Sequence, residues 1–407
     1  MSILAVSMLI PMSFDLANDN ADWQAFAAAA LFSGFIGICL WLANGRIKDT
    51  DLGLKEAFLL TNGAWVLIGL FGSLPFYFST LNLSVVDAVF ESTSGITTTG
   101  STILSDIEQA SSGLLIWRAL LQWLGGVGII VMAMAVLPML SVGGMQLFRT
   151  ESFETADKVI PRATQLAGGI FAVYTGLTIL WTAMLAGAGM PSFDALAHAM
   201  TTLATGGYST KNSSIGAFDS HLIELIVIGG MIVGSLPFVH YLALTRGGWR
   251  SLIKDPQVRW FAVLMAAVIS LITFDLNRDG HSWAEALRLS SFNAVSVMTG
   301  TGYGTADFAL WGGSSTTLLL ICMFIGGCAG STTCGIKMFR LQVLAANIKV
   351  QLARLLRPHA VVLAYYNKRP VPEPVLDAVM GFFYLYILCF VALTMILGLF
   401  GLDFQTA

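Results

Sequence analysis

Apolar segments of helix-spanning length recur along the whole chain, separated by short charged loops. They cover residues 23–43, 54–78, 114–140, 164–188, 222–244 and 258–276. About 20 helical residues cross a hydrocarbon core, and inside that core every backbone polar group must find a partner within the protein. Only 11% of the residues are charged, against roughly 25% in soluble domains. The sequence therefore predicts an all-α protein that crosses a membrane several times.

A unit of four parts is repeated within this pattern: a long apolar segment, a shorter one, a glycine- and threonine-rich loop, and a second long segment. The loops occupy residues 97–101, 204–210 and 299–305. Asp87 precedes Gly100 by 13 residues and Asp194 precedes Gly207 by 13, so the short helices enter their loops alike. We interpret both acids as helix caps rather than ion ligands. Repeated units of this kind enclose a site only together.

The three loops share a central glycine, small or hydroxyl residues before it, and no carboxylate. They read Thr98-Thr99-Gly100-Ser101, Thr205-Gly206-Gly207-Tyr208-Ser209 and Gly300-Thr301-Gly302-Tyr303-Gly304. Glycine allows successive carbonyls to turn toward one axis and to replace the water around a cation, as in the T-V-G-Y-G loops of potassium channels. The candidate potassium-binding residues are Thr98, Thr99, Gly100, Thr205, Gly206, Gly207, Gly300, Thr301 and Gly302.

Glycine-rich loops also have two other common uses. Glycines also permit close helix packing, but three loops at matched offsets favour a shared function. Phosphate-binding loops precede their helices, whereas these follow them, and G-K-[ST] is absent from the sequence.

A second glycine cluster, residues 326–337, interrupts the apolar segment that begins near Leu318. Irregular backbone at this depth is tolerated where protein or a water-filled cavity surrounds it, which makes the cluster a candidate gate beneath the loops. The candidate gating residues are Gly327, Gly330, Ser331, Thr332, Gly335 and Lys337. Lys337 either repels cations at the inner mouth or marks the cytoplasmic end of a helix.

Charge gives the orientation and excludes several classes. If loops alternate sides, 17 of the 21 lysines and arginines fall on one side, which places that side and the amino terminus in the cytoplasm. A net charge of -3 argues against a nucleic-acid partner. The five histidines form no catalytic pattern, so an enzyme is not expected. The five cysteines are expected to be buried thiols.

The loops and the run Gly-Gly-Cys-Ala-Gly-Ser-Thr-Thr-Cys-Gly-Ile-Lys resemble those of the TrkH-type subunit of bacterial potassium uptake systems, in the Trk/Ktr/HKT superfamily. The resemblance implies four M1-P-M2 units, similar to potassium-channel subunits, around a pseudo-four-fold pore in the inner membrane. It further implies a homodimer, membrane lipid as surroundings and a cytosolic TrkA-type nucleotide-binding partner. No cofactor is implied besides K⁺, the transported ion. Gly100, Gly207 and Gly302 would be filter glycines, with Gly100 favouring potassium over sodium. Cys334 stands where the family usually has glycine.

We expect two amino-terminal helices and a loop in 1–53, repeats in 54–148, 149–250 and 251–357, and a linker with the start of a fourth repeat in 358–407. A fourth loop is expected about 100 residues after Gly302, but the sequence stops at Ala407, so the fourth unit is expected to be incomplete, as in a fragment or a truncated product.

The predicted function is potassium uptake through a selectivity filter. Two alternatives stay open at this point: a sodium-permeable transporter of the same fold, and a cation-coupled symporter of small solutes built on broken helices.

Overall fold

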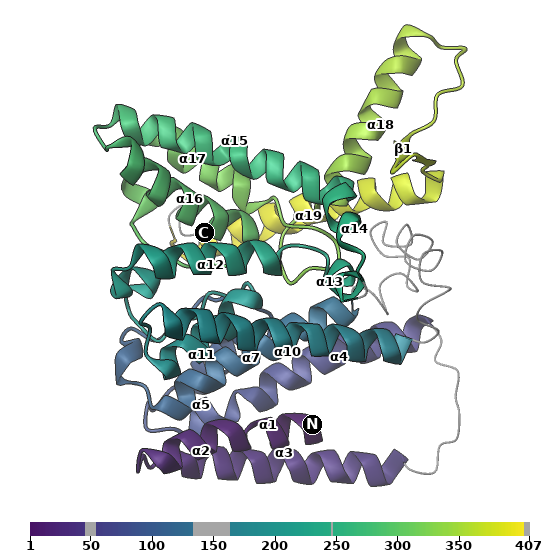
Figure 1. Ribbon diagram of the computed structural model, residues 1–407. Coiled ribbons are helices and arrows are strands. Elements are labelled where there is room, and N and C mark those ends of the chain that lie inside the picture. Colours follow the sequence, from purple (N-terminus) through teal and green to yellow (C-terminus); the bar gives the residue numbers. More distant parts are fainter. Residues whose placement is uncertain (45–53, 133–162, 246, 403–407) are drawn as a thin grey trace. The chain divides into compact units, whose positions relative to one another are not determined.

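The computed structural model describes residues 1–44, 54–132, 163–245 and 247–402, which are mainly helical (Figure 1). The chain divides into two compact units, the first made of residues 1–132 and 164–337. Its helices of 19 residues or more are α3 (Trp23–Asn44), α4 (Leu54–Gly72), α7 (Ser112–Val131), α10 (Ala163–Gly187) and α15 (Pro256–Arg278). Its other helices are α1 (Ser2–Ser7), α2 (Leu9–Ala17), α5 (Leu74–Phe78), α6 (Val85–Ile96), α11 (Ser192–Leu203), α12 (His221–Gly234), α13 (Phe238–Leu244), α14 (Trp249–Lys254), α16 (Trp283–Thr299) and α17 (Gly313–Met323).

The all-helical, multi-spanning prediction is confirmed. In the described ranges six helices are long and apolar enough to cross a membrane: Trp23–Ala43, Phe58–Phe78, Ser112–Val131, Leu166–Gly187, Pro256–Arg278 and Glu373–Leu399. The continuous segment predicted at 222–244 is wrong, because α12 and α13 meet at an angle of 99°. Pro237 explains the break, since proline has no N–H to donate and disfavours helix in the residue before it.

The three short helices predicted before the loops are α6, α11 and α16, and α7 and α12 hold them side by side. Helix α7 packs against both α6 and α11, and α12 packs against both α11 and α16. Each pair of neighbouring loop-carrying helices therefore packs against one shared helix, and the loops at their carboxyl ends are brought together. The predicted end of the third apolar segment, residues 133–140, lies outside the described residues.

The two acids that begin the short helices behave differently. The hydroxyl of Ser84 accepts from the N–H of Asp87 at 3.1 Å and donates to its carboxylate at 2.7 Å, so Asp87 takes part in a helix cap. The carboxylate of Asp194 instead accepts from the hydroxyl of Thr210 at 2.6 Å. Asp194 therefore ties the start of α11 to the end of the loop that follows this helix.

The amino-terminal helices α1 to α3 are anchored to the first repeat by buried polar contacts. Asp15 accepts from the N–H of Gly113 at 2.6 Å and from the hydroxyl of Ser111 at 3.1 Å, which satisfies donors at the start of α7. Apolar packing accompanies these bonds, with Phe26 and Trp117 fully buried in one core cluster.

The second unit contains α18 (Met338–Leu356), the strands β1 (Tyr365–Tyr366) and β2 (Arg369–Pro370), and α19 (Glu373–Leu399). The hairpin turns at Asn367 and Lys368, both with left-handed backbone (φ 47° and 64°), as two-residue turns of type I′ require.

The expectation of buried cysteines holds for only part of the set. Cys322 and Cys328 are buried, whereas Cys39, Cys334 and Cys389 are exposed, and all five are free thiols. Cys39 and Cys389 lie in apolar helices long enough to span a membrane. On such a helix a small apolar side chain is as favourable against lipid as it is inside the protein.

Candidate functional site

The backbone turns in the same way in all three loops (first filter loop, 97–101; second, 204–209; third, 299–304). Left-handed φ occurs at the central glycine and two residues before it: Thr98 (55°) and Gly100 (82°), Thr205 (49°) and Gly207 (78°), Gly300 (69°) and Gly302 (85°). The residue between them is not left-handed in any loop. A left-handed β-branched residue costs roughly 1–2 kcal/mol. Such strain at matched positions indicates a geometry kept for function.

Each short helix ends in the same hydrogen bond. The bonds run from the N–H of Thr99 to the carbonyl of Ser94, from Gly206 to Thr201, and from Thr301 to Ser296, all at 2.9 Å. This closure is the one that glycine usually makes in a Schellman cap, yet threonine takes the left-handed position in two of the three loops. The carboxyl ends of the helices, which carry partial negative charge, therefore lead directly into the loops and favour a cation there.

The predicted convergence of the three loops is present as backbone contact. A Cβ added to Gly100 would lie 2.1 Å from the carbonyl oxygen of Gly206, and one added to Gly207 would lie 1.8 Å from that of Thr301. The first loop thus touches the second, and the second touches the third. A Cβ at Gly302 would meet no described atom within 4 Å.

Most carbonyls of the candidate potassium-binding residues have no donor within the described part of the chain. Among the nine, only that of Gly206 accepts a hydrogen bond, from Nε2 of Gln122 at 2.7 Å. Thr98, Thr205 and Thr301 are almost completely buried. A buried carbonyl without a donor is costly unless water or an ion satisfies it. Chemically, the arrangement can replace part of the hydration shell of a monovalent cation.

Tyrosines secure the second and third filter loops from behind. The hydroxyl of Tyr208 donates to the carbonyl of Glu91 in α6 at 2.9 Å. The hydroxyl of Tyr303 lies 2.5 Å from that of Thr201 in α11. Both tyrosines are buried, and each reaches the short helix of the preceding repeat. Neighbouring units therefore hold each other's loops.

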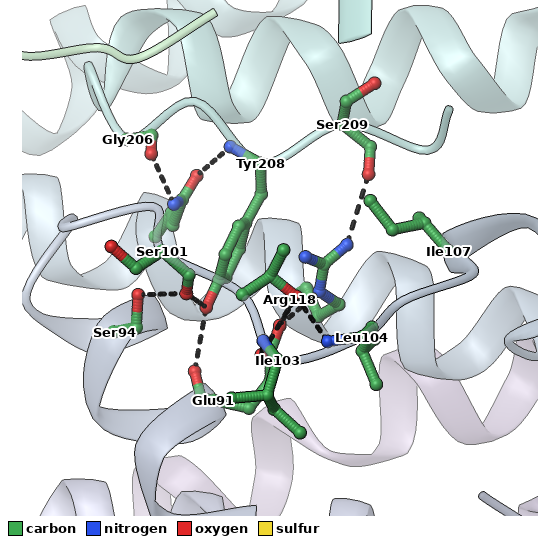
Figure 2. Close-up of polar contacts among 12 residues, drawn as sticks. Glu91, Ser94, Ser101, Ile103, Leu104, Ile107, Arg118, Gly206, Tyr208 and Ser209 are labelled. Atoms are coloured by element: carbon green, nitrogen blue, oxygen red, sulfur yellow. Dashed lines mark hydrogen bonds and ion pairs between the residues drawn. The ribbon is translucent and has the colours of Figure 1, made fainter. Parts of the chain in front are cut away.

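A buried ion pair beside the second filter loop was missed by sequence reasoning. Nε of Arg118 in α7 lies 2.7 Å from Oε1 of Glu91, and both side chains are almost completely buried (Figure 2). In the sequence, Arg118 is one of the four basic residues that fall outside the 17 on the cytoplasmic side. The available signal was a pair of opposite charges within two apolar segments, which in a membrane protein indicates a pairing inside the bundle.

The candidate gating residues follow α17 and bond to the break between α12 and α13. The N–H of Cys328 donates to the carbonyl of Ser235 at 3.0 Å, and that of Thr332 to Gly234 at 3.1 Å. Because the helix breaks at Pro237, these carbonyls lack their helical donors and are open to another segment.

Residues 332–334 of this gating loop contact the first left-handed residue of every filter loop. The Sγ of Cys334 lies 3.8 Å from the hydroxyl of Thr98, and the hydroxyl of Thr205 donates to that of Thr332 at 3.1 Å. A Cβ at Gly300 would lie 3.5 Å from the Cβ of Cys334. The predicted gate and the predicted filter are therefore in direct contact.

The other candidate gating residues shape the loop itself. Gly330 and Gly335 are left-handed (φ 74° for both), and a Cβ at Gly327 would lie 2.7 Å from the carbonyl oxygen of Ser235. Ser331 is buried and donates to the carbonyl of Cys328 at 2.6 Å. The ammonium of Lys337 donates to the carbonyl of Thr333, so this charge folds back onto the gating loop.

His198 is a packing residue. Its Nδ1 lies 2.8 Å from the carbonyl oxygen of Asp194 and its Nε2 lies 2.9 Å from the hydroxyl of Ser209. Over the described residues, no group of three or more His, Cys, Asp or Glu side chains could hold a metal ion.

Comparison with known proteins covers nearly the whole chain. The model of the TrkH family, described as cation transport protein, matches residues 23–406. The Trk system potassium uptake protein TrkI of Halomonas elongata is 39% identical over 407 residues, which are 100% of this chain and 82% of that protein. TrkH of Escherichia coli K12 is 36% identical over 403 residues, 98% of this chain and 83% of that protein. The crystal structure of the potassium transporter TrkH from Vibrio parahaemolyticus superposes with a TM-score of 0.90 at 34% identity, covering 99% of this chain and 84% of that one.

Proposed function

The chain belongs to the TrkH family of cation transport proteins, and we propose that it takes up K⁺ across a bacterial inner membrane through the three filter loops. The observation that carries this proposal is the row of loop carbonyls without protein donors, at matched left-handed turns. Potassium uptake is the activity printed in the names of the relatives. Carbonyl dipoles suit a monovalent ion that must bind and then leave.

Selectivity for potassium over sodium follows from the same loops. Gly100, against which the carbonyl of Gly206 packs, leaves the central position of the first filter loop without a side chain. The first alternative, a sodium-permeable transporter of the same fold, would differ in the ratio of potassium flux to sodium flux. The second alternative, a small-solute symporter, has weaker support because Glu91, the buried acid beside the filter loops, is already paired with Arg118.

The experiment is ion flux into liposomes that contain the full-length protein, under a potassium gradient with sodium as competitor. We expect potassium uptake that depends on the membrane potential and exceeds sodium uptake. Gly302→Ser places a side chain at a filter glycine and should lower potassium flux. Equal potassium and sodium flux in the wild type would establish the first alternative, and unchanged potassium permeation in Gly302→Ser would argue against the filter assignment.

Gating is assigned to residues 326–337. Contacts of Thr332 and Cys334 with Thr205 and Thr98 support a closed arrangement in which this gating loop lies against the filter loops. Opening requires it to leave these contacts. The repeat boundaries 54–148, 149–250 and 251–357 belong to the same proposal.

Partners are proposed on family grounds. A TrkA-type nucleotide-binding subunit would bind the cytoplasmic side of a homodimer, with the amino terminus in the cytoplasm. The second unit offers basic residues for this contact, among them Arg354, Arg357, Lys368 and Arg369. Co-purification of a nucleotide-binding protein with the wild type, and its loss when the four residues are changed to glutamine, would test the assignment.

A further inference from the structure

Arg118 makes three kinds of contact from the buried face of α7. Its Nε donates to Glu91 at 2.7 Å, its Nη1 donates to the carbonyl of Ser209 at 3.1 Å, and its guanidinium carbon lies 4.0 Å from the centre of the Tyr208 ring. Figure 2 shows the guanidinium between the glutamate of α6 and the second filter loop. Its side chain is 1% exposed, so these contacts are made away from bulk water.

These contacts require the guanidinium rather than positive charge alone. A planar fork donates along its edges in two directions while its face stacks on an aromatic ring. A lysine ammonium has the charge but cannot bridge a carboxylate and a carbonyl while it stacks. Charge-assisted bonds of this kind are about twice as strong as neutral ones.

Glu91 connects Arg118 to the segment after the first filter loop. Its carboxylate accepts from the hydroxyl of Thr102 at 3.0 Å and from the N–H of Ile103 at 3.1 Å. The ion pair therefore links the outgoing backbone of the first filter loop with Ser209 in the second.

Gln122, one helical turn after Arg118, completes the support of the second filter loop. Its Nε2 donates to the carbonyl of Gly206 at 2.7 Å, and its Oε1 accepts from the N–H of Tyr208 at 3.1 Å. Together with the bond to Ser209, helix α7 fixes backbone groups on both sides of Gly207. Since the direction of filter carbonyls determines how they fit a given ion, this support bears directly on ion choice.

We propose that Arg118 is a positioning residue that fixes the shape of the second filter loop and thereby sets the preference of the pathway for K⁺ over Na⁺. The inference rests on the proposed function, because it assigns a role within that ion pathway. Arg118 does not touch the ion; it acts through Ser209 and Tyr208.

The chain contains a matched control. Arg288 in α16 and Glu224 in α12 form a second ion pair at 3.6 Å, again between a helix that carries a filter loop and a helix that packs against it. The Glu224 side chain is 8% exposed and that of Arg288 is 33% exposed. Within the described part of the chain, neither side chain bonds to a filter loop. The same arginine-to-lysine change at Arg288 therefore alters an ion pair without altering loop support.

The experiment compares Arg118→Lys with Arg288→Lys in the full-length protein. Reversal potentials measured across bilayers with K⁺ on one side and Na⁺ on the other give the permeability ratio, and thermal unfolding reports stability. We expect the K⁺/Na⁺ ratio to fall on the order of tenfold in Arg118→Lys, as the loss of a charge-assisted bond implies, while cation current persists. Arg288→Lys should keep the wild-type ratio.

An unchanged ratio in Arg118→Lys overturns the inference, as does an equal fall in both variants. If Arg118→Lys is not recovered from membranes, Tyr208→Leu leaves the ion pair and removes the ring on which Arg118 stacks. That variant must then show the lowered ratio, and a wild-type ratio there overturns the inference as well. A wild type that carries no potassium current overturns the proposed function and this inference with it. If the wild type and both variants all prefer K⁺ over Na⁺ to the same degree, only the inference is overturned.

Discussion

Gly207 packs directly against the carbonyl oxygen of Thr301, so close that a Cβ on the glycine would lie 1.8 Å from that oxygen. The two residues are far apart in the sequence and belong to different filter loops. Their contact shows that the second and third loops form one continuous wall of backbone.

Gly207→Ala should abolish potassium uptake. The new methyl group would overlap the carbonyl of Thr301, and the left-handed backbone at this position (φ 78°) disfavours any L side chain. Gly304→Ala is the control, because a Cβ at Gly304 meets no described atom within 4 Å and its φ is not left-handed. Both variants are measured by potassium uptake into cells that lack their own potassium uptake systems, and Gly304→Ala should take up potassium as the wild type does. Normal uptake in Gly207→Ala would contradict the filter geometry.

Thr332→Val should raise potassium flux in the absence of any regulatory partner. Its hydroxyl shares one proton between the carbonyls of Leu203 at 3.0 Å and Gly234 at 2.9 Å and accepts from Thr205, so valine removes contacts that hold the gating loop against the filter. Each lost hydrogen bond is worth about 1 kcal/mol, so several-fold higher basal flux in liposomes is expected. Thr317→Val, which removes an exposed hydroxyl bonded only to its own helix, should behave as the wild type. Equal flux in both variants would argue against the gate.

Thiol-specific reagents should inhibit potassium flux through Cys334. This thiol is exposed yet lies 3.8 Å from the hydroxyl of Thr98, so an attached group would obstruct the inner side of the first filter loop. Inhibition should persist when Cys39 and Cys389, the other exposed cysteines, are changed to serine, and should disappear in Cys334→Ser. Potassium flux into liposomes is measured for each variant before and after the thiol reagent is added. Inhibition that survives Cys334→Ser would place the sensitive group elsewhere.

Tyr303→Phe should lower stability. The phenol lies 2.5 Å from the hydroxyl of Thr201 and 3.3 Å from that of Thr202, and it is 1% exposed, so the change leaves two buried hydroxyls without this partner. A loss of roughly 1–2 kcal/mol is expected. Thermal unfolding in detergent measures it, with Tyr384→Phe on the exposed surface of α19 as the control. A midpoint equal to that of the control would contradict the role given to this tether.

The contact between the loop that follows α6 and the loop that follows α11 should depend on pH through Asp106. The side chains of Asn212 and then Gln109 donate to its carboxylate and lower its pKa below the usual value. A native pKa below the unfolded value of about 3.9 stabilises the protein above that pH, and this contribution is lost as pH falls through the native pKa. Asp106→Asn should therefore unfold at a lower temperature than the wild type near pH 7. The two midpoints should converge in acid, and a constant difference at all pH values would disprove the linkage.

Much of the local geometry could be predicted from residue types. Apolar length predicted the spanning helices, and glycine and threonine at fixed offsets predicted the loops that follow the short helices. The break in the segment 222–244 was available from Pro237 but was not recognised, because the apolar run continues through it.

The supports behind the filter could not be predicted in the same way. Arg118, Glu91 and Gln122 are far from the second filter loop in sequence, and a charge in an apolar segment signals that a partner exists without naming it. The contacts of Thr98 and Thr205 with residues 332–334 likewise join segments more than a hundred residues apart.

The amino-acid sequence by itself determined that the chain spans a membrane and carries three glycine-bearing, carboxylate-free loops, since hydropathy and backbone freedom are properties of short segments. Only the tertiary structure decided that Gly100, Gly207 and their neighbours meet backbone to backbone, and that an arginine and a glutamine of α7 hold one of the loops. The physical reason is that short-range steric and solvation preferences act within a segment, whereas the partner of a buried carbonyl or charge depends on how distant helices pack.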